Sequence, residues 1–217
     1  MTPSGRGVPV VTISATYGSA GAVIGPAVAE QLGVPFLDRA IPAAVAHSLS
    51  VPLAQVLEHD ERRPGVLERV IRAMAIGGTP YGGEVPPTPS DRVSDVFKIE
   101  TEQAIHEMAS STGGVVLGRA GAIVLAGHPT ALHARLHGPR DARIAQAMAG
   151  GELDEATAVA RLDETDRARK AYVRHFYRVE ANDPKLYHLI IDSTAIPVPT
   201  CINLIVVAAQ ARVKSVR

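Results

Sequence analysis

Residues 8–37 read VPVVTISATYGSAGAVIGPAVAEQLGVPFL, and this stretch predicts the class of the fold. It opens with a β-branched run, residues 8–14, of the kind found in strands that are buried on both faces. A turn of small residues, 15–21, leads into the apolar spacing of a helix that should end at Gly33. Residues 34–37 form a second short strand. Strand, glycine turn, helix and strand together are the opening of a parallel α/β fold.

The rest of the chain continues this alternation of strands and helices. Further strands are expected at 114–118, 131–137 and 187–192, and helices at 91–110, 139–149, 152–177 and 200–213. Residues 39–76 read as helices punctuated by prolines, and residues 77–92, GGTPYGGEVPPTPSDR, as a surface loop. Five strands separated by helices, without an internal repeat, predict a single three-layer α/β/α sandwich with a five-stranded parallel sheet over residues 1–217.

Composition excludes several classes of function. The 22 basic and 22 acidic residues balance, which argues against nucleic-acid partners and against a polybasic membrane binder. A single cysteine, Cys201, excludes an internal disulfide framework, and we expect it to be a buried thiol. The eight histidines form no metal-binding pair, since His133 and His137 lie on an expected strand. Without a signal-peptide pattern or an apolar run of about 18 residues, we expect a cytoplasmic protein with no membrane partner. The apolar C-terminal helix leaves room for a homodimer.

The glycine turn is a candidate anion site, because backbone N–H groups and the helix dipole converge there. Its residues are Gly18, Ser19, Ala20, Gly21 and Ala22. The phosphate-loop template GxxxxGK[ST] fails, since no lysine precedes Lys98, and so does the dinucleotide template GxGxxG. Asp38 nevertheless stands where a dehydrogenase holds a ribose, so an NAD(P)-binding oxidoreductase is one alternative. Against it, no tyrosine has a lysine four residues later, as a short-chain dehydrogenase would require. A tight turn without a ligand is another alternative.

Arginines at two distant places fit the same purpose. Arg119 follows the third strand within Gly118-Arg119-Ala120-Gly121, at the end of a parallel sheet where ligands bind. The helix over 152–177 carries Asp166, Arg167 and Arg169, which suits a lid whose guanidinium groups neutralise phosphates. The alternative is a surface helix whose charges pair with one another three and four residues apart.

Four segments resemble the cytidylate-kinase-like family, a branch of the P-loop nucleoside monophosphate kinases. They are VTISATYGSAGAVIGPAVAEQLGVPFLDRAI, GGVVLGRAGAIVL, DETDRARKAYVRHFY and YHLIIDST. The resemblance implies a P-loop kinase fold, ATP with Mg²⁺, and transfer of the γ-phosphoryl group to a nucleoside monophosphate such as CMP. It also implies that residues 39–110 are an acceptor-binding insertion and residues 152–180 a lid. By the same resemblance, Gly18 to Ala22 bind the nucleotide, Asp38, Arg39, Arg119 and Asp166 bind the acceptor, and Arg119, Arg167 and Arg169 are catalytic.

The chain departs from the family most clearly in the loop. Relatives commonly read Gly-Ser-Gly-Gly-Arg-Glu-Ile-Gly, whereas this chain has Ala22 and Val23 in place of the Arg and Glu. Cytidylate kinases also carry an Asp where Ala120 stands and an Arg where Leu162 stands. A bare loop binds an anion through its backbone but offers no side-chain cation to the donor phosphates. A nucleotide-binding protein of this fold that has lost turnover is therefore an alternative to the active kinase.

Overall fold

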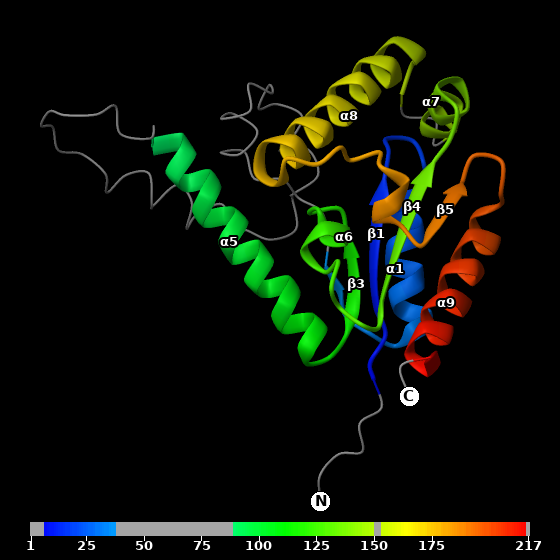
Figure 1. Cartoon of the computed structure of the whole chain (residues 1–217). Helices are drawn as coiled ribbons and strands as arrows, with labels where there is room; N and C mark the ends of the chain where they lie inside the picture. The colour runs from blue at the N-terminus through cyan, green and yellow to red at the C-terminus, as the bar shows by residue number, and fades with distance from the viewer. Residues whose placement is uncertain (1–6, 38–88, 150–152, 216–217) are drawn as a thin grey trace, which may run out of the picture. The chain divides into compact units, whose positions relative to one another are not determined.

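The computed structural model describes residues 7–37, 89–149 and 153–215 (Figure 1). The chain divides into two compact units, one formed by Met1–Arg39 with Ala104–Arg217 and the other by Ala40–Gln103. Most of the second unit, with the predicted helices of 39–76, lies outside the described residues. Helix α5, Pro89–Ser110, corrects one boundary, because the last four residues of the predicted loop 77–92 are helical. Proline is well suited to a first helical turn, since its missing N–H has no helical partner there.

Five parallel strands form the sheet, as predicted. They are β1 Val10–Ala15, β2 Phe36–Leu37, β3 Gly114–Leu117, β4 Ala131–His137 and β5 Leu189–Asp192. The strand order is β2-β3-β1-β4-β5. Strand β1 is central, with Ile13 beside Leu117 of β3 and Ala15 beside Leu136 of β4. The turn that follows β1 is therefore flanked by the segments that follow β3 and β4.

Helices cover both faces of this sheet, which confirms the three layers. Figure 1 shows α1, Gly21–Leu32, and α9, Val198–Ser215, together on one face. There Val11 and Ile13 pack with Ile24 of α1 and Ile205 of α9. The opposite face, through Val10 and Val116, packs against Ile105 of α5 and Leu125, which follows the short helix α6, Gly121–Val124. The alternation of β1 side chains between two apolar layers explains its β-branched, nearly unbroken hydrophobic sequence.

Two further helices follow the carboxyl end of β4. Helix α7 spans Arg140–Met148 and α8 spans Glu155–Tyr177, and they share a small core of Ile144, Ala158 and Leu162. Helix α8 begins after Asp154, whose carboxylate accepts a hydrogen bond of 2.8 Å from the Thr157 amide. The short elements α6 and η1, Pro184–Leu186, were not expected from the sequence, since each has too few residues to show a periodic pattern. None of the helices in the described ranges combines the length and apolarity needed to cross a membrane.

Candidate functional site

The turn between β1 and α1 has a backbone that only small residues tolerate. Gly18 has a φ of 74°, and a Cβ placed on it would lie 2.2 Å from the backbone oxygen of Arg143. A Cβ on Gly21 would lie 2.4 Å from the Cβ of Ala15. Ala20, the N-cap of α1, adopts a left-handed φ of 57°, which costs an L-residue about 1–2 kcal/mol. The run of small residues is therefore required by close packing and by backbone conformation.

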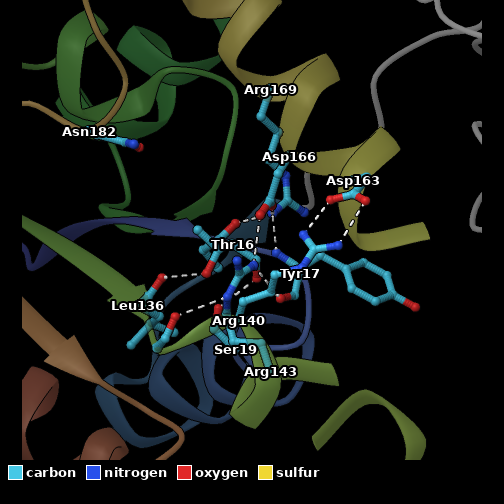
Figure 2. A network of polar contacts seen from close by, with 12 residues as sticks. Thr16, Tyr17, Ser19, Leu136, Arg140, Arg143, Asp163, Asp166, Arg169 and Asn182 are labelled. Atoms are coloured by element: carbon cyan, nitrogen blue, oxygen red, sulfur yellow. Dashed lines mark hydrogen bonds and ion pairs between the residues drawn. The ribbon is translucent and has the colours of Figure 1, made fainter. Parts of the chain in front are cut away.

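The carbonyl groups of this turn are held by donors from other parts of the chain. Arg143 Nη1 donates to the Tyr17 oxygen at 2.9 Å, and the Ser193 hydroxyl donates to the Ser19 oxygen at 2.9 Å. The Thr16 oxygen accepts the Ser19 hydroxyl at 2.7 Å. Figure 2 shows this network around Thr16, Tyr17 and Ser19. Because these three carbonyl oxygens are already bonded, they are not offered to a ligand.

Four amide groups in this turn are available for an anion. Within the described ranges, the N–H groups of Gly18, Ala20, Gly21 and Ala22 form no hydrogen bond. The last two open helix α1, whose dipole adds roughly half a positive charge at this end. Clustered, unpaired amides at a helix N-terminus are a standard arrangement for phosphate binding. These four residues belong to the predicted loop, Gly18 to Ala22; the fifth, Ser19, has its amide, carbonyl and hydroxyl groups bonded within the protein.

Two arginine–aspartate pairs join α7 to α8 beside this turn (Figure 2). Arg143 Nη1 lies 2.7 Å from Asp166 Oδ2, and the Tyr17 amide donates to Asp166 Oδ1 at 3.0 Å. Three residues earlier on each helix, Arg140 and Asp163 form a second, exposed pair. Both oxygens of Asp166 thus have partners within the protein. These carboxylates of α8 pair with arginines of α7, whereas the sequence suggested pairs along α8 itself. Among the described residues, one pair lies along α8, with Arg169 Nη1 3.9 Å from Asp166 Oδ1.

The predicted lid arginines are placed differently from each other. The Arg169 guanidinium donates to the Ala15 oxygen at the start of the turn, whereas the Arg167 side chain is exposed. Two positions along an α-helix differ by about 200°, so these residues occupy opposite sides of α8. The structure therefore brings Arg169, and not Arg167, to the turn.

The turn after β3 shares one feature with the turn after β1, a left-handed alanine at the N-cap of the next helix. It reads Gly118-Arg119-Ala120-Gly121, with positive φ at the first three residues, and Ala120 is the N-cap of α6. The Gly118 amide donates to the Ile13 oxygen at 2.8 Å, which anchors this turn directly beside β1. Half-buried Arg119 thus follows the strand next to the candidate anion site. Asp38 and Arg39, the other predicted acceptor residues, lie outside the described residues.

Two histidines stack on each other away from the turn, His133 on β4 and His188 directly before β5. His133 is buried, and its Nδ1 lies 2.9 Å from the Thr12 hydroxyl. Its amide donates to Nδ1 of His188 at 3.0 Å, and the two rings stack 4.8 Å apart. Burial lowers the pKa of His133 to about 4, with smaller effects from His188 and Arg212. Cys201 is also buried, and burial raises the pKa of its thiol. Among the described residues, no three His, Cys, Asp or Glu side chains are grouped to hold a metal.

A model of the cytidylate kinase-like family matches residues 10–195, which include the β1 turn, Arg119, Arg143, Asp166 and Ser193. The chain belongs to the cytidylate kinase-like family. None of the curated proteins is similar enough in sequence to count as a match.

Solved structures show the same fold at low identity. An uncharacterized protein from Eubacterium ventriosum ATCC 27560 matches with a TM-score of 0.63 and 17% identity, covering 93% of this chain and 98% of its own. A gluconokinase from Sinorhizobium meliloti 1021 matches with a TM-score of 0.50 and 17% identity, covering 97% and 94% of the two chains. These structures share the α/β fold of this chain, a five-stranded parallel sheet with helices, as the sequence predicted.

The strand order weighs against the oxidoreductase alternative. In the dinucleotide-binding fold the second strand lies directly beside the first, so that its terminal acidic residue reaches the cofactor ribose. In this member of the cytidylate kinase-like family, β3 lies between β1 and β2. Asp38 follows β2, which is not a neighbour of β1, the strand that carries the glycine turn. The position of Asp38 therefore no longer favours a nicotinamide cofactor.

Two residues of the site, Arg143 and Ser193, were missed from the sequence. Each follows the carboxyl end of a strand, β4 and β5 respectively, just as Arg119 follows β3. The reasoning that singled out Arg119 applies equally to Arg143, which comes six residues after His137. Ser193, directly after Asp192, has a hydroxyl whose purpose becomes visible only in its contact with the Ser19 oxygen.

Proposed function

We propose that this protein is a nucleotide kinase that transfers the γ-phosphoryl group of ATP to a nucleoside monophosphate such as CMP. The observation that carries the proposal is the set of unpaired amides at Gly18, Ala20, Gly21 and Ala22, at the N-terminus of α1. Family membership and the kinase fold support phosphoryl transfer as the reaction class. Such a reaction asks the protein mainly to position the phosphates and to neutralise their charge.

The proposal assigns a role to each part of the site. The loop amides hold the donor phosphates, and Arg169, next to the loop, supplies positive charge. Arg119, on the turn after β3, binds the phosphate of the acceptor together with Asp38 and Arg39. Asp166 as an acceptor residue and Arg167 as a catalytic one stay predictions from the resemblance. Asp166 has both oxygens engaged by the protein, and the Arg167 side chain is exposed.

The loop offers amides for ATP but no ligand for Mg²⁺. The Ser19 hydroxyl is fully buried and donates to the Thr16 oxygen, while Ala22 and Val23 carry no side-chain oxygen. Mg²⁺ is commonly bound through substrate phosphates and water with few protein ligands. The donor set of this loop therefore does not fit a protein-held Mg²⁺, and we derive no catalytic step through the metal.

A second candidate is a nucleotide-binding protein of the same fold without turnover. It is favoured by the exposed Ala22 and Val23, which replace the Arg and Glu of its relatives and leave the loop without a side-chain charge. The two candidates share the binding site and differ only in whether the γ-phosphoryl group is transferred.

A coupled assay with ATP, Mg²⁺ and a panel of nucleoside monophosphates tests the proposal. Acceptor-dependent release of ADP would support the kinase. Nucleotide binding without ADP release would select the second candidate, and absence of any nucleotide binding would refute both. Binding of NAD(P) but not ATP would revive the oxidoreductase alternative.

A matched pair of glycine variants shows whether the loop is the binding site. Gly18→Ala and Gly33→Ala both place a Cβ at a positive φ, of 74° and 66°, so both lose about 1 kcal/mol of stability or more. Only Gly18→Ala meets another backbone group, the Arg143 oxygen, whereas Gly33 faces open space. Nucleotide binding by calorimetry should be lost in Gly18→Ala and retained in Gly33→Ala. Equal binding by both variants would place the site elsewhere.

A further inference from the structure

Arg143 has no role in the reaction proposed above, yet it is among the few buried charged side chains of the described residues, with 9% of its surface exposed. It lies in the first turn of α7 and donates to three acceptors. Its Nε bonds the Gly138 oxygen at 3.1 Å, and its Nη1 bonds both the Tyr17 oxygen at 2.9 Å and Asp166 Oδ2 at 2.7 Å. These acceptors belong to the end of β4, the glycine turn and α8.

The contacts of Arg143 and Asp166 close a ring around a single residue of the turn. The Tyr17 amide donates to Asp166, the Tyr17 carbonyl accepts from Arg143, and Arg143 and Asp166 bond each other. Both peptide groups that flank the Tyr17 Cα are therefore restrained. A rotation of either peptide would break a charge-assisted hydrogen bond, and such bonds are roughly twice as strong as neutral ones.

The restraint on the Tyr17 carbonyl also sets the direction of the next amide. A trans peptide is planar, so its C=O and the following N–H point in opposite directions. Because Arg143 holds the Tyr17 oxygen on the α7 side, the Gly18 N–H points away from α7. The Ser193 hydroxyl holds the Ser19 oxygen in the same manner and so directs the Ala20 N–H. These are two of the four unpaired amides of the loop.

We propose that Arg143 is a positioning residue of the phosphate loop, which aims the Gly18 amide at the donor phosphates by holding the Tyr17 carbonyl. This inference rests on the proposed function, since it assumes that the loop binds phosphate. A loop without a lysine depends on its amides for affinity, so their alignment carries more of the binding than in a loop that has a side-chain cation. The planar guanidinium suits this role because it bonds three acceptors in a fixed geometry, which a lysine ammonium does not.

The test compares Arg143→Lys with Arg140→Lys, a matched change one turn earlier on α7 in an exposed pair that does not contact the loop. Binding of inorganic tripolyphosphate and of ATP is measured by calorimetry, and amide shifts of Gly18 and Ala20 are followed by NMR. In the wild-type chain, both amides should shift on addition of tripolyphosphate. If the wild-type chain binds neither probe, the proposed function fails, and the role inferred for Arg143 fails with it.

In Arg143→Lys, affinity for both probes should fall on the order of 10- to 100-fold, the size expected for a misplaced binding group. The ligand-induced shift of Gly18 should disappear while that of Ala20 remains, and Arg140→Lys should bind within about twofold of wild type. A purely structural role would change both amides equally or neither, and wild-type affinity in Arg143→Lys would overturn the proposal.

If Arg143→Lys does not fold, the double variant Arg143→Gln/Asp166→Asn removes both charges of the pair, so that neither partner is left as an unpaired buried charge. It should lose the Gly18 response in the same way, and retention of that response would overturn the proposal. Ser193→Ala provides the reciprocal measurement, because it frees the Ser19 carbonyl. It should weaken the response of Ala20 and leave that of Gly18 intact, and the opposite pattern would contradict the inference.

Discussion

The two arginine–aspartate pairs between α7 and α8 differ in surroundings rather than in chemistry. Arg140–Asp163 and Arg143–Asp166 have the same sequence separation of 23 residues, and each pair lies one helical turn from the other. The side chains of the outer pair are 47% and 45% exposed, and those of the inner pair 11% and 16%. Only the inner pair also contacts the glycine turn, through Tyr17. The comparison teaches that charge pattern alone does not distinguish a solvated pair from one that holds a turn of the backbone.

Removing one carboxylate from each pair should show the largest difference. Asp166→Ala leaves the Arg143 cation buried without its counter-ion, which costs about 3–5 kcal/mol for a buried pair. Asp163→Ala leaves Arg140 exposed to water and should change the melting temperature very little. Chemical denaturation of both variants provides the measurement. Similar losses of stability in the two variants would show that the difference in burial does not change what each pair contributes to stability.

Acid titration should separate the outer pair from the buried His133 of β4. Burial lowers the pKa of His133 to about 4 from 6.5. As the pH falls, His133 is therefore protonated in the unfolded chain before it is protonated in the folded chain. His133 therefore contributes stability above pH 6.5 that is lost between pH 6.5 and 4, at most about 3 kcal/mol. The hydrogen bond from Arg140 lowers the pKa of Asp163, so the outer pair keeps its charge over this range and loses its contribution only at lower pH.

The measurement is the free energy of unfolding of wild type, His133→Asn and His128→Asn between pH 7 and 4. The decline should be reduced in His133→Asn and kept in His128→Asn. An unchanged decline in His133→Asn would assign it to other groups.

The next test concerns Arg119, in the turn after β3, and asks whether this side chain binds substrate. Arg119→Ala should weaken binding of a nucleoside monophosphate by about tenfold, as expected for a charge-assisted contact worth about 1.5 kcal/mol. Its melting temperature should stay close to that of wild type, in contrast to Asp166→Ala. Calorimetry measures the binding affinity and thermal unfolding measures the melting temperature of the same samples. A large drop in melting temperature with unaltered binding would make Arg119 structural.

High salt should produce the smallest effect, and it should weaken the exposed pair more than the buried one. At 1 M NaCl the screening length is about 3 Å, so the interaction between Arg140 and Asp163 should weaken toward zero. The interaction between Arg143 and Asp166 should persist, because screening acts poorly on groups removed from solvent. Double-mutant cycles for each pair at low and high salt measure both interaction energies. Equal salt sensitivity would contradict the difference in burial.

Much of this architecture follows from local pattern. The β-branched run of β1, the helix that ends at Gly33 and the small residues of the glycine turn are all governed by neighbours within a few residues. Periodicity and backbone preference therefore predicted the five strands, the three layers and the place of the glycine turn. Family motifs added Arg119, Asp166 and Arg169, and the departure at Ala22 and Val23 was visible without a structure.

What the sequence alone could not determine lies in contacts between residues far apart along the chain. Tyr17 meets Arg143 across 126 positions, and Ser19 meets Ser193 across 174. No local pattern specifies such partners, because they depend on which strands lie side by side and on the depth that each side chain reaches. Tertiary structure therefore decided that β3 separates β1 from β2, that Arg169 rather than Arg167 faces the loop, and that one of two chemically alike ion pairs holds the loop in shape.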